Sequence, residues 1–265
     1  MGNPTCKLIV ALSFFFILLA SLPSNAQQKT AFKQGERLRY LINYGPIKGG
    51  EAILEVKAGA YEGKPANHLV LSGKTIGVAN MLYGVHDTYQ SFTNAKTDLP
   101  YKAIRDIKEG GYKHYSEQVF DHWTRSDSTI VYSSKVGEKL APKNSNDILS
   151  AFYFLRNQLM WKPIKVGDTL TIQTYFTDEI YTLKVRFLGY DNIKMKIGTI
   201  RAMKFMPIVI TGRVFKSQDD MAVWFSADRN FVPVRIKFDI VVGSVYCDLV
   251  DYNGLLYNFD ALTKK

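Results

Sequence analysis

The segment 144–161 is the one convincing helix in a chain whose other segments have the pattern of β-strands. Apolar residues recur along it at the spacing of one helical face: Ile148, Phe152, Leu155 and Leu159. Ser145, Asn146 or Asp147 can cap its N-terminus, because their side-chain oxygens accept hydrogen bonds from the free amides of the first turn. Pro163 then ends the helix. The sequence therefore predicts a helix over 145–161.

Strict alternation of apolar and polar residues marks the strands. Leu38, Tyr40, Ile42 and Tyr44 alternate with more polar neighbours, and the segments 181–187 and 234–240 repeat the pattern. A period of two is typical of a sheet with one buried face. The expected fold is mainly β, with antiparallel curved sheets in a half-barrel or sandwich-like arrangement. One central helix would pack on the sheet, because the buried face needs a cover.

Several segments have less regular patterns. The apolar stretch 78–85 predicts a short helix or a loop, and 189–198 predicts a turn region. Strands are expected over 202–211 and 255–259. The stretch 133–143 is polar and rich in turn residues.

An internal repeat organises the chain. Gly35-Glu36-Arg37-Leu38 resembles Gly167-Asp168-Thr169-Leu170, and the segment 91–102 resembles 224–235. From Gly35 to Pro100 is 65 positions, and from Gly167 to Pro233 is 66. Chance similarity among common turn residues is the alternative, but order and spacing both agree. We expect two pseudo-repeats, about 32–141 and 165–260, joined by the helix.

The first 26 residues have the features of a secretory signal peptide. Lys7 precedes an apolar run, and Ser24-Asn25-Ala26 fits a small-x-small cleavage site. A single-pass anchor is the alternative. We expect one β-rich domain over 27–265, exported to the periplasm of a Gram-negative-type bacterium or secreted. Cys247 would then be the only cysteine, and its place in an alternating strand predicts a buried apolar role.

The chain is basic, with 34 Lys and Arg against 24 Asp and Glu and a formal net charge of +10. This charge favours anionic head groups or acidic glycans as partners, although a mixed solvated surface is the simpler interpretation. Export argues against nucleic-acid binding. The outward positions of the regular strands are Lys, Arg, Thr and Asp, so we expect no membrane span once the signal is removed.

No catalytic or metal-binding motif stands out. Ser72-Gly73-Lys74-Thr75 resembles the end of a phosphate-binding loop, but the required glycine at position 68 is a histidine. The four histidines lack the short spacings of a metal site. The acidic pairs 178–179 and 219–220 fall in predicted turns. We therefore expect no catalytic residues, no metal and no cofactor, and a protein that is not an enzyme.

The same motifs resemble those of an exported bacterial family known as domain of unknown function 3108. The resemblance covers most of the chain after residue 26 and rests on seven short patterns: Phe32-x-x-Gly35-Glu36-x-Leu38-x-Tyr40, Gly49-Gly50-x-Ala52, the helix residues 147–156, Val166-Gly167-Asp168, Gly198-Thr199, Trp224 to Asp228, and Val232-Pro233. This family implies no activity and no catalytic residues. A weaker similarity to periplasmic lipoprotein-carrier half-barrels implies a curved apolar sheet covered by helices, and a lipid or lipoprotein partner only by analogy of fold.

These observations favour the binding of a hydrophobic or lipid-like ligand in a groove between the helix and the sheet. The candidate groove residues are Met81, Leu82, Tyr83, Phe152, Tyr153, Leu155 and Trp161. The simplest alternative is an ordinary core, in which side chains fill that space. A structural or interaction module that binds an envelope protein or a glycan is a second hypothesis, and a hydrolase with an unrecognised site is a third.

Overall fold

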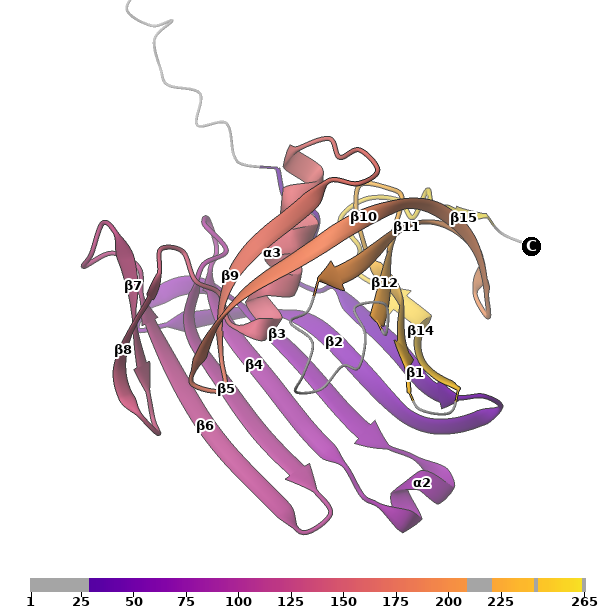
Figure 1. Ribbon diagram of the computed structural model, residues 1–265, viewed down its shortest axis with the longest axis horizontal. Coiled ribbons are helices and arrows are strands. Elements are labelled where there is room, and N and C mark those ends of the chain that lie inside the picture. Colours follow the sequence, from indigo (N-terminus) through magenta and orange to yellow (C-terminus); the bar gives the residue numbers. More distant parts are fainter. Residues whose placement is uncertain (1–28, 209–220, 241–242, 264–265) are drawn as a thin grey trace, which may run out of the picture.

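The computed structural model describes residues 29–208, 221–240 and 243–263 (Figure 1). The expected signal peptide therefore lies outside the described residues, as do the acidic pair 219–220 and the end of the expected strand 202–211. No described helix has the length and apolar character needed to cross a lipid bilayer.

The strands form one antiparallel sheet with the order β8-β7-β6-β5-β4-β3-β2-β1-β14-β13-β12-β11-β10-β9, and β15 pairs with β11. The first group of strands is β1 (Arg37–Tyr44), β2 (Ile47–Tyr61), β3 (Lys64–Thr75), β4 (His86–Asn94), β5 (Pro100–Glu109), β6 (Tyr112–Asp121), β7 (Ser128–Ser133) and β8 (Gly137–Pro142). The second group is β9 (Thr169–Phe176), β10 (Glu179–Met195), β11 (Gly198–Ile208), β12 (Met221–Ser226), β13 (Pro233–Asp239), β14 (Ser244–Asn253) and β15 (Leu262–Thr263). The helices are α2 (Gly77–Leu82) and α3 (Ile148–Trp161).

The sheet consists of two meanders that meet along one seam. β1–β6 run as successive hairpins, β9–β14 do the same, and β1 pairs with β14 in antiparallel register. Figure 1 shows the sheet curving strongly, with β9 and β10 arching back over β5. The expectation of a mainly β, antiparallel, curved sheet is confirmed.

Both meanders begin with the same backbone feature. Gly35 has φ 93° and Gly167 has φ 94°, values in a region that side chains other than glycine rarely adopt. The Gly35 amide donates to the Val56 carbonyl (2.7 Å), and the Gly167 amide donates to the Phe187 carbonyl (2.8 Å). Each glycine thereby ties the start of its meander to the second strand.

The helix α3 begins where the sequence places it. Asp147 is the N-cap, and its carboxylate accepts hydrogen bonds from the Leu149 and Ser150 amides (2.8 and 3.0 Å). Ser91 on β4 donates to the same carboxylate (2.6 Å), so the cap also anchors the helix to the sheet. The predicted buried face was partly wrong, because Ile148 is 37% exposed.

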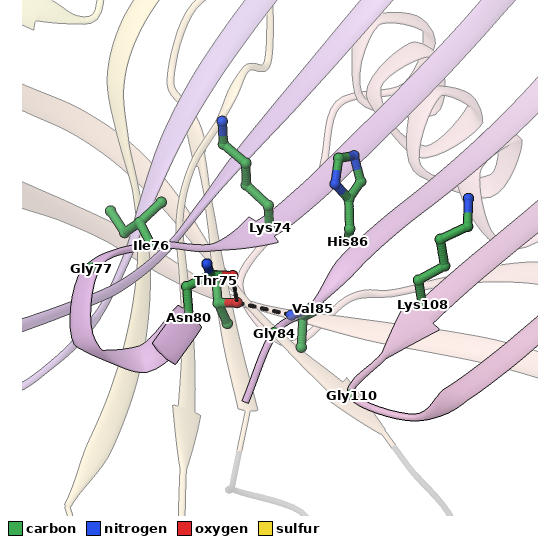
Figure 2. Close-up of a pocket in the computed structure, with 10 residues that line it drawn as sticks. All are labelled: Lys74, Thr75, Ile76, Gly77, Asn80, Gly84, Val85, His86, Lys108 and Gly110. Atoms are coloured by element: carbon green, nitrogen blue, oxygen red, sulfur yellow. Dashed lines mark hydrogen bonds between the residues drawn. The ribbon is translucent and has the colours of Figure 1, made fainter. Parts of the chain in front are cut away.

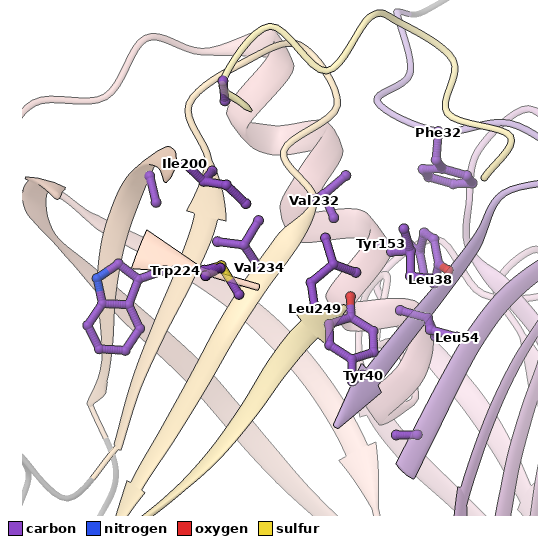
Figure 3. Close-up of a cluster of buried hydrophobic side chains, with 14 of the residues drawn as sticks. Phe32, Leu38, Tyr40, Leu54, Tyr153, Ile200, Trp224, Val232, Val234 and Leu249 are labelled. Carbon is purple, nitrogen blue, oxygen red and sulfur yellow. The ribbon is translucent and has the colours of Figure 1, made fainter. Parts of the chain in front are cut away.

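The buried side of α3 is broader than one stripe because the helix packs against two clusters. Leu149 and Tyr153 belong to a cluster that also contains residues of β1, β2 and β14 (Figure 3). Leu155 and Leu159 belong to a second cluster, built on β9 to β12. Helix α3 is therefore covered by both meanders.

A buried ion pair joins α3 to the segment that precedes β1. The Arg156 guanidinium binds both carboxylate oxygens of Glu36 (2.6 and 2.8 Å), and both residues are almost fully buried. Arg156 also donates to the carbonyls of Asn230 and Ala31. Because every buried charge here has partners, the cluster avoids the large cost of an unpaired ion.

The free edge of β9 is covered by the segment before α3. The Asn146 amide donates to the Gln173 carbonyl, and the Tyr175 amide donates to the Asn146 carbonyl, both at 2.8 Å. Tyr175 packs edge-on against Phe120 of β6. The two ends of the curved sheet are thereby brought near each other on either side of this segment.

Three sequence expectations need correction. The predicted turn region 189–198 is mostly strand: β10 continues to Met195, and the turn occupies only 196–197 before β11. Gly189 (φ 127°) lies at a register shift that bends β10 without ending it. The expected strand 255–259 is irregular, and Phe259 instead packs against Tyr252. The turn-rich stretch 133–143 contains β8. The stretch 78–85, expected to be a short helix or a loop, contains most of the short helix α2 followed by an irregular link.

Candidate functional site at the α2 end of the sheet

The predicted groove residues on α3 lie mostly in the core. Tyr153 and Leu155 are 1% and 4% exposed, and Phe152 is half-buried against Phe225 (ring centroids 5.8 Å apart). The Trp161 indole donates to the Lys29 carbonyl (2.5 Å). At these positions side chains fill the space between helix and sheet.

The other predicted residues lie far from α3. Met81, Leu82 and Tyr83 are 85%, 82% and 55% exposed, and Val78 is 67% exposed. They belong to α2 and its C-cap, which form the connection between β3 and β4 at the outer end of the sheet (Figure 1). The structure therefore does not bring the seven predicted residues into one groove.

The base of α2 is held in place by the neighbouring strands. The Thr75 hydroxyl accepts from the Val85 amide (2.9 Å) and lies 3.1 Å from the Asn80 side-chain oxygen. The Tyr83 hydroxyl donates to the Glu109 carbonyl at the end of β5 (3.2 Å). These contacts fix the helix position while its apolar side chains stay exposed.

A pocket of about 640 Å³ opens beside α2 (Figure 2). Its lining includes Asn80 and the backbone around Gly77 and Gly84. Figure 2 shows Lys74, His86 and Lys108 extending in the same direction from adjacent strands. A second pocket of about 150 Å³ shares two of these residues and extends the site along β2 and β3: Glu51, Ile53, Ser72, Gly73, Lys74 and His86.

The strand register explains this row of basic side chains. Lys74 is paired with His86, Val85 is bridged to Glu109, and Lys108 is paired with Lys113. We call these four exposed residues the basic row: Lys74, His86, Lys108 and Lys113. Neighbouring strands lie about 4.8 Å apart, so like charges in such a row repel one another.

Acidic groups only partly balance the basic row. Glu51 is paired with Lys74 in the sheet register, and the Asp106 carboxylate forms an ion pair with Lys108 (2.8 Å). No ion pair joins Lys74 or Lys113 to a carboxylate within the described part of the chain. The row can therefore bind a negatively charged group.

A third pocket, of about 450 Å³, lies on the second meander. The Trp224 indole donates to Asp191 (2.7 Å), and Lys204 Nζ lies 5.3 Å from the centroid of the Trp224 ring. Arg235 forms two hydrogen bonds with Asp248, which raise the pKa of Arg235. This mixture of aromatic and charged groups suits a polar surface better than an acyl chain.

Metal-binding groups do not gather in the described residues. No set of three or more His, Cys, Asp or Glu residues there is placed to hold a metal ion. Burial raises the pKa of the Cys247 thiol to about 12, which leaves it in the unreactive thiol form at neutral pH.

Sequence reasoning missed the basic row. Each member lies near the end of its own strand, and the four are spread over 40 residues of sequence, from 74 to 113. Their alignment follows from the register of β3 to β6, which a single sequence does not reveal. The one available signal is Lys74, which belongs to the incomplete phosphate-loop pattern.

Comparison with known proteins gives the fold but no activity. The chain has no match among curated proteins. A β-barrel-like protein of the domain of unknown function DUF1849 from Brucella abortus has a TM-score of 0.55 at 10% identity, covering 82% of this chain and 96% of that one. This match shows a shared fold.

Two further solved structures are more distant. A DUF1089 family protein from Pseudomonas aeruginosa has a TM-score of 0.38 at 9% identity, covering 80% of this chain and 93% of its own. A protein with a YmcC-like fold from Bacteroides fragilis has a TM-score of 0.33 at 11% identity, covering 85% of this chain and 100% of its own.

The family assignment rests on sequence. The family model described as "protein of unknown function (DUF3108)" matches residues 39–250, a span that includes most of both meanders and all of α3. The chain therefore belongs to the DUF3108 family.

Proposed function

We propose that this chain is an exported, non-enzymatic protein of the bacterial cell envelope that binds an anionic amphiphile beside α2. The negatively charged group of the ligand lies against the basic row, and its apolar part lies against Met81 and Leu82. The sequence predicts a hydrophobic or lipid-like ligand in a groove between α3 and the sheet. The ligand proposed here also carries a negative charge, and its location is the pocket beside α2.

The observation that carries this proposal is the position of exposed apolar side chains next to unbalanced positive charge. Met81 and Leu82 are more than four-fifths exposed, although hydrogen bonds tie the base of the helix to neighbouring strands. Three members of the basic row, Lys74, His86 and Lys108, line the pocket beside α2, whose 640 Å³ is within the size range of small-molecule sites. An amphiphile would reduce the repulsion within the row and cover apolar surface at the same time.

The two meanders also support an internal duplication. β1 and β9 are each eight residues long, and the glycine feature precedes both. A register shift falls between Phe92 and Thr93 on β4, and another falls between Trp224 and Phe225 on β12. The two register shifts are separated by 132 positions, the same separation as between Gly35 and Gly167. We infer that the halves are pseudo-repeats and that α2 specialises the first one for binding.

The proposal is tested with the chain 27–265 purified from a periplasm without detergent. Native mass spectrometry with solvent extraction would detect a co-purifying amphiphile. Uptake of lyso-phosphatidylglycerol is then compared for the wild type and for the triple variant Lys74→Gln, His86→Gln and Lys108→Gln. The matched control replaces three exposed lysines on other strands: Lys139→Gln, Lys184→Gln and Lys194→Gln.

We expect the triple variant in the basic row to lose uptake and the control variant to keep it. No uptake by the wild type, or equal uptake by both variants, contradicts the proposal. A neutral detergent of equal chain length should bind more weakly, because it lacks the charge that the basic row recognises.

A second candidate function is binding of an envelope glycan or protein through the pocket on the second meander. Trp224, Arg235 and Lys204 favour it, because aromatic and basic groups together are typical of polar recognition surfaces. Such binding should weaken with salt. It should also be lost in Lys204→Ala and unaffected by changes in the basic row.

A further inference from the structure

Exposed apolar side chains gather at one end of the sheet. Successive antiparallel hairpins turn at alternating ends, so the β1–β2, β3–β4, β5–β6 and β13–β14 connections all lie at the end that carries α2 (Figure 1). Each connection has at least one large apolar residue that is half-exposed or more: Ile47 (57%), Val78, Met81, Leu82 and Tyr83 on or beside α2, Tyr112 (56%) and Ile240 (50%). We call this set the apolar rim.

Positive charge lies directly behind the apolar rim. Lys48 follows Ile47, and Lys113 follows Tyr112. Lys74 and His86 lie on the strands on either side of α2. Apolar groups therefore form the outermost layer, with basic residues one to four positions further from the tip. This is the arrangement by which a surface structure enters the interface of an anionic bilayer.

The shape of the apolar rim favours a lipid surface over a folded partner. Its side chains belong to four separate connections, and the most exposed, Met81 and Leu82, project from a helix of six residues. A protein partner needs a continuous complementary surface of about 800 Å². A fluid bilayer accepts separate projecting groups without such complementarity.

We propose that the apolar rim docks this protein on an anionic lipid bilayer, with Met81 and Leu82 in the interface and the basic row against the head groups. This inference rests on the proposed function, because docking at this end presents the amphiphile pocket to the membrane. Docking and ligand uptake are nevertheless separate events and can be measured separately.

Docking is tested by flotation of the chain 27–265 with vesicles of phosphatidylcholine alone or mixed with phosphatidylglycerol. The wild type is compared with the double variant Met81→Asp and Leu82→Asp. The control double variant is Leu140→Asp and Val166→Asp, at apolar positions 54% and 67% exposed that lie outside the apolar rim. Circular dichroism confirms that each variant is folded.

We expect the wild type and the control variant to float with the mixed vesicles. The floated fraction of the α2 variant should be lower by about tenfold or more, because its two large apolar side chains are no longer available for burial in the bilayer. High salt should also weaken flotation. Equal flotation with neutral vesicles, or equal flotation of the α2 variant, overturns the docking proposal. So does a wild-type dimer that the α2 variant dissociates, because the apolar rim would then contact a second copy.

A water-soluble short-chain phosphatidylglycerol separates this proposal from the proposed function. Its binding is followed by calorimetry without vesicles. Short-chain lipid binding without flotation overturns docking alone. Flotation without short-chain lipid binding overturns the amphiphile pocket, and membrane attachment would then be the role of this end of the sheet.

Discussion

At the residue scale, the buried pair of Arg156 and Glu36 has the largest expected effect on stability. Removing one partner leaves a buried charge without compensation, and in other proteins this costs about 3–5 kcal/mol. Arg156→Met should therefore lower the free energy of unfolding by about 3–5 kcal/mol, as measured by urea denaturation.

A partly exposed ion pair provides the control for this prediction. Arg235 and Asp248 form an equally short bidentate pair, with side chains 21% and 22% exposed. Arg235→Met should cost about 1 kcal/mol, because water solvates the remaining carboxylate. Similar costs for the two variants would mean that the Arg156 site admits water.

Two buried titratable groups have opposite effects on stability in acid. Burial raises the pKa of Asp98 from 3.8 to about 6, against a hydrogen bond from Asn157 that lowers it. Burial lowers the pKa of His122 from 6.5 to about 4. The folded state holds the Asp98 proton that the unfolded chain releases, so this group favours folding at low pH and loses that contribution as pH rises through 6. His122 favours folding above pH 6.5 and loses its contribution as pH falls toward 4.

Asp98→Asn should expose the His122 effect. The Asn side chain still accepts the hydrogen bond from Asn157, and it tolerates the positive φ (59°) of this position. We expect the variant to gain about 1–3 kcal/mol at pH 7 and to lose stability more steeply between pH 6.5 and 4. Urea denaturation across this range measures both, with the exposed Asp260→Asn as control. An unchanged pH slope would contradict the assignment of Asp98.

At the scale of elements, α2 and α3 differ in what their apolar residues do. Leu155 is packed in the core, so Leu155→Ala should lower the free energy of unfolding by about 2–5 kcal/mol. Met81→Ala should change it by less than about 0.5 kcal/mol, since Met81 is 85% exposed. Thermal denaturation compares the two. A large loss of stability in Met81→Ala would identify α2 as structural and weaken its proposed binding role.

Local patterns predicted the elements better than their contacts. The alternation in β1 and the cap at Asp147 act within a few residues. The cap is confirmed, and the alternation holds for Leu38 and Tyr40, whereas Tyr44 at the end of the strand is 41% exposed. The buried side of α3 was not predictable in the same way, because both meanders pack on it and bury Arg156 as well as Leu149. The expected groove residues Tyr153 and Leu155 therefore lie in the core. The basic row depends on pairing between strands, which one sequence does not specify.

At the scale of the whole molecule, α3 couples the two meanders. Arg156 binds Glu36, which precedes β1, and also binds the backbone of Asn230 between β12 and β13. The helix supplies Leu149 to one hydrophobic cluster and Leu155 to the other. Neither half can lose its structure while leaving the contacts of α3 intact. The molecule should therefore unfold in one cooperative step despite its duplicated architecture.

Tryptophan fluorescence tests this coupling, because each meander has its own reporter. Trp123 follows β6 in the first meander, and Trp224 lies on β12 in the second. In the background Trp161→Phe, one variant keeps Trp123 with Trp224→Phe, and the other keeps Trp224 with Trp123→Phe. In each variant, the fluorescence transition in urea should coincide with the circular dichroism transition of that same variant.

Adding Arg156→Met to each single-reporter background should move both transitions to lower urea by the same amount, because the residue stabilises both meanders through one helix. Separate transitions, or a shift confined to the Trp224 reporter, would show that the first meander is stable alone. In that case α2 and its pocket would belong to an independently folded half, and α3 would serve to attach the second.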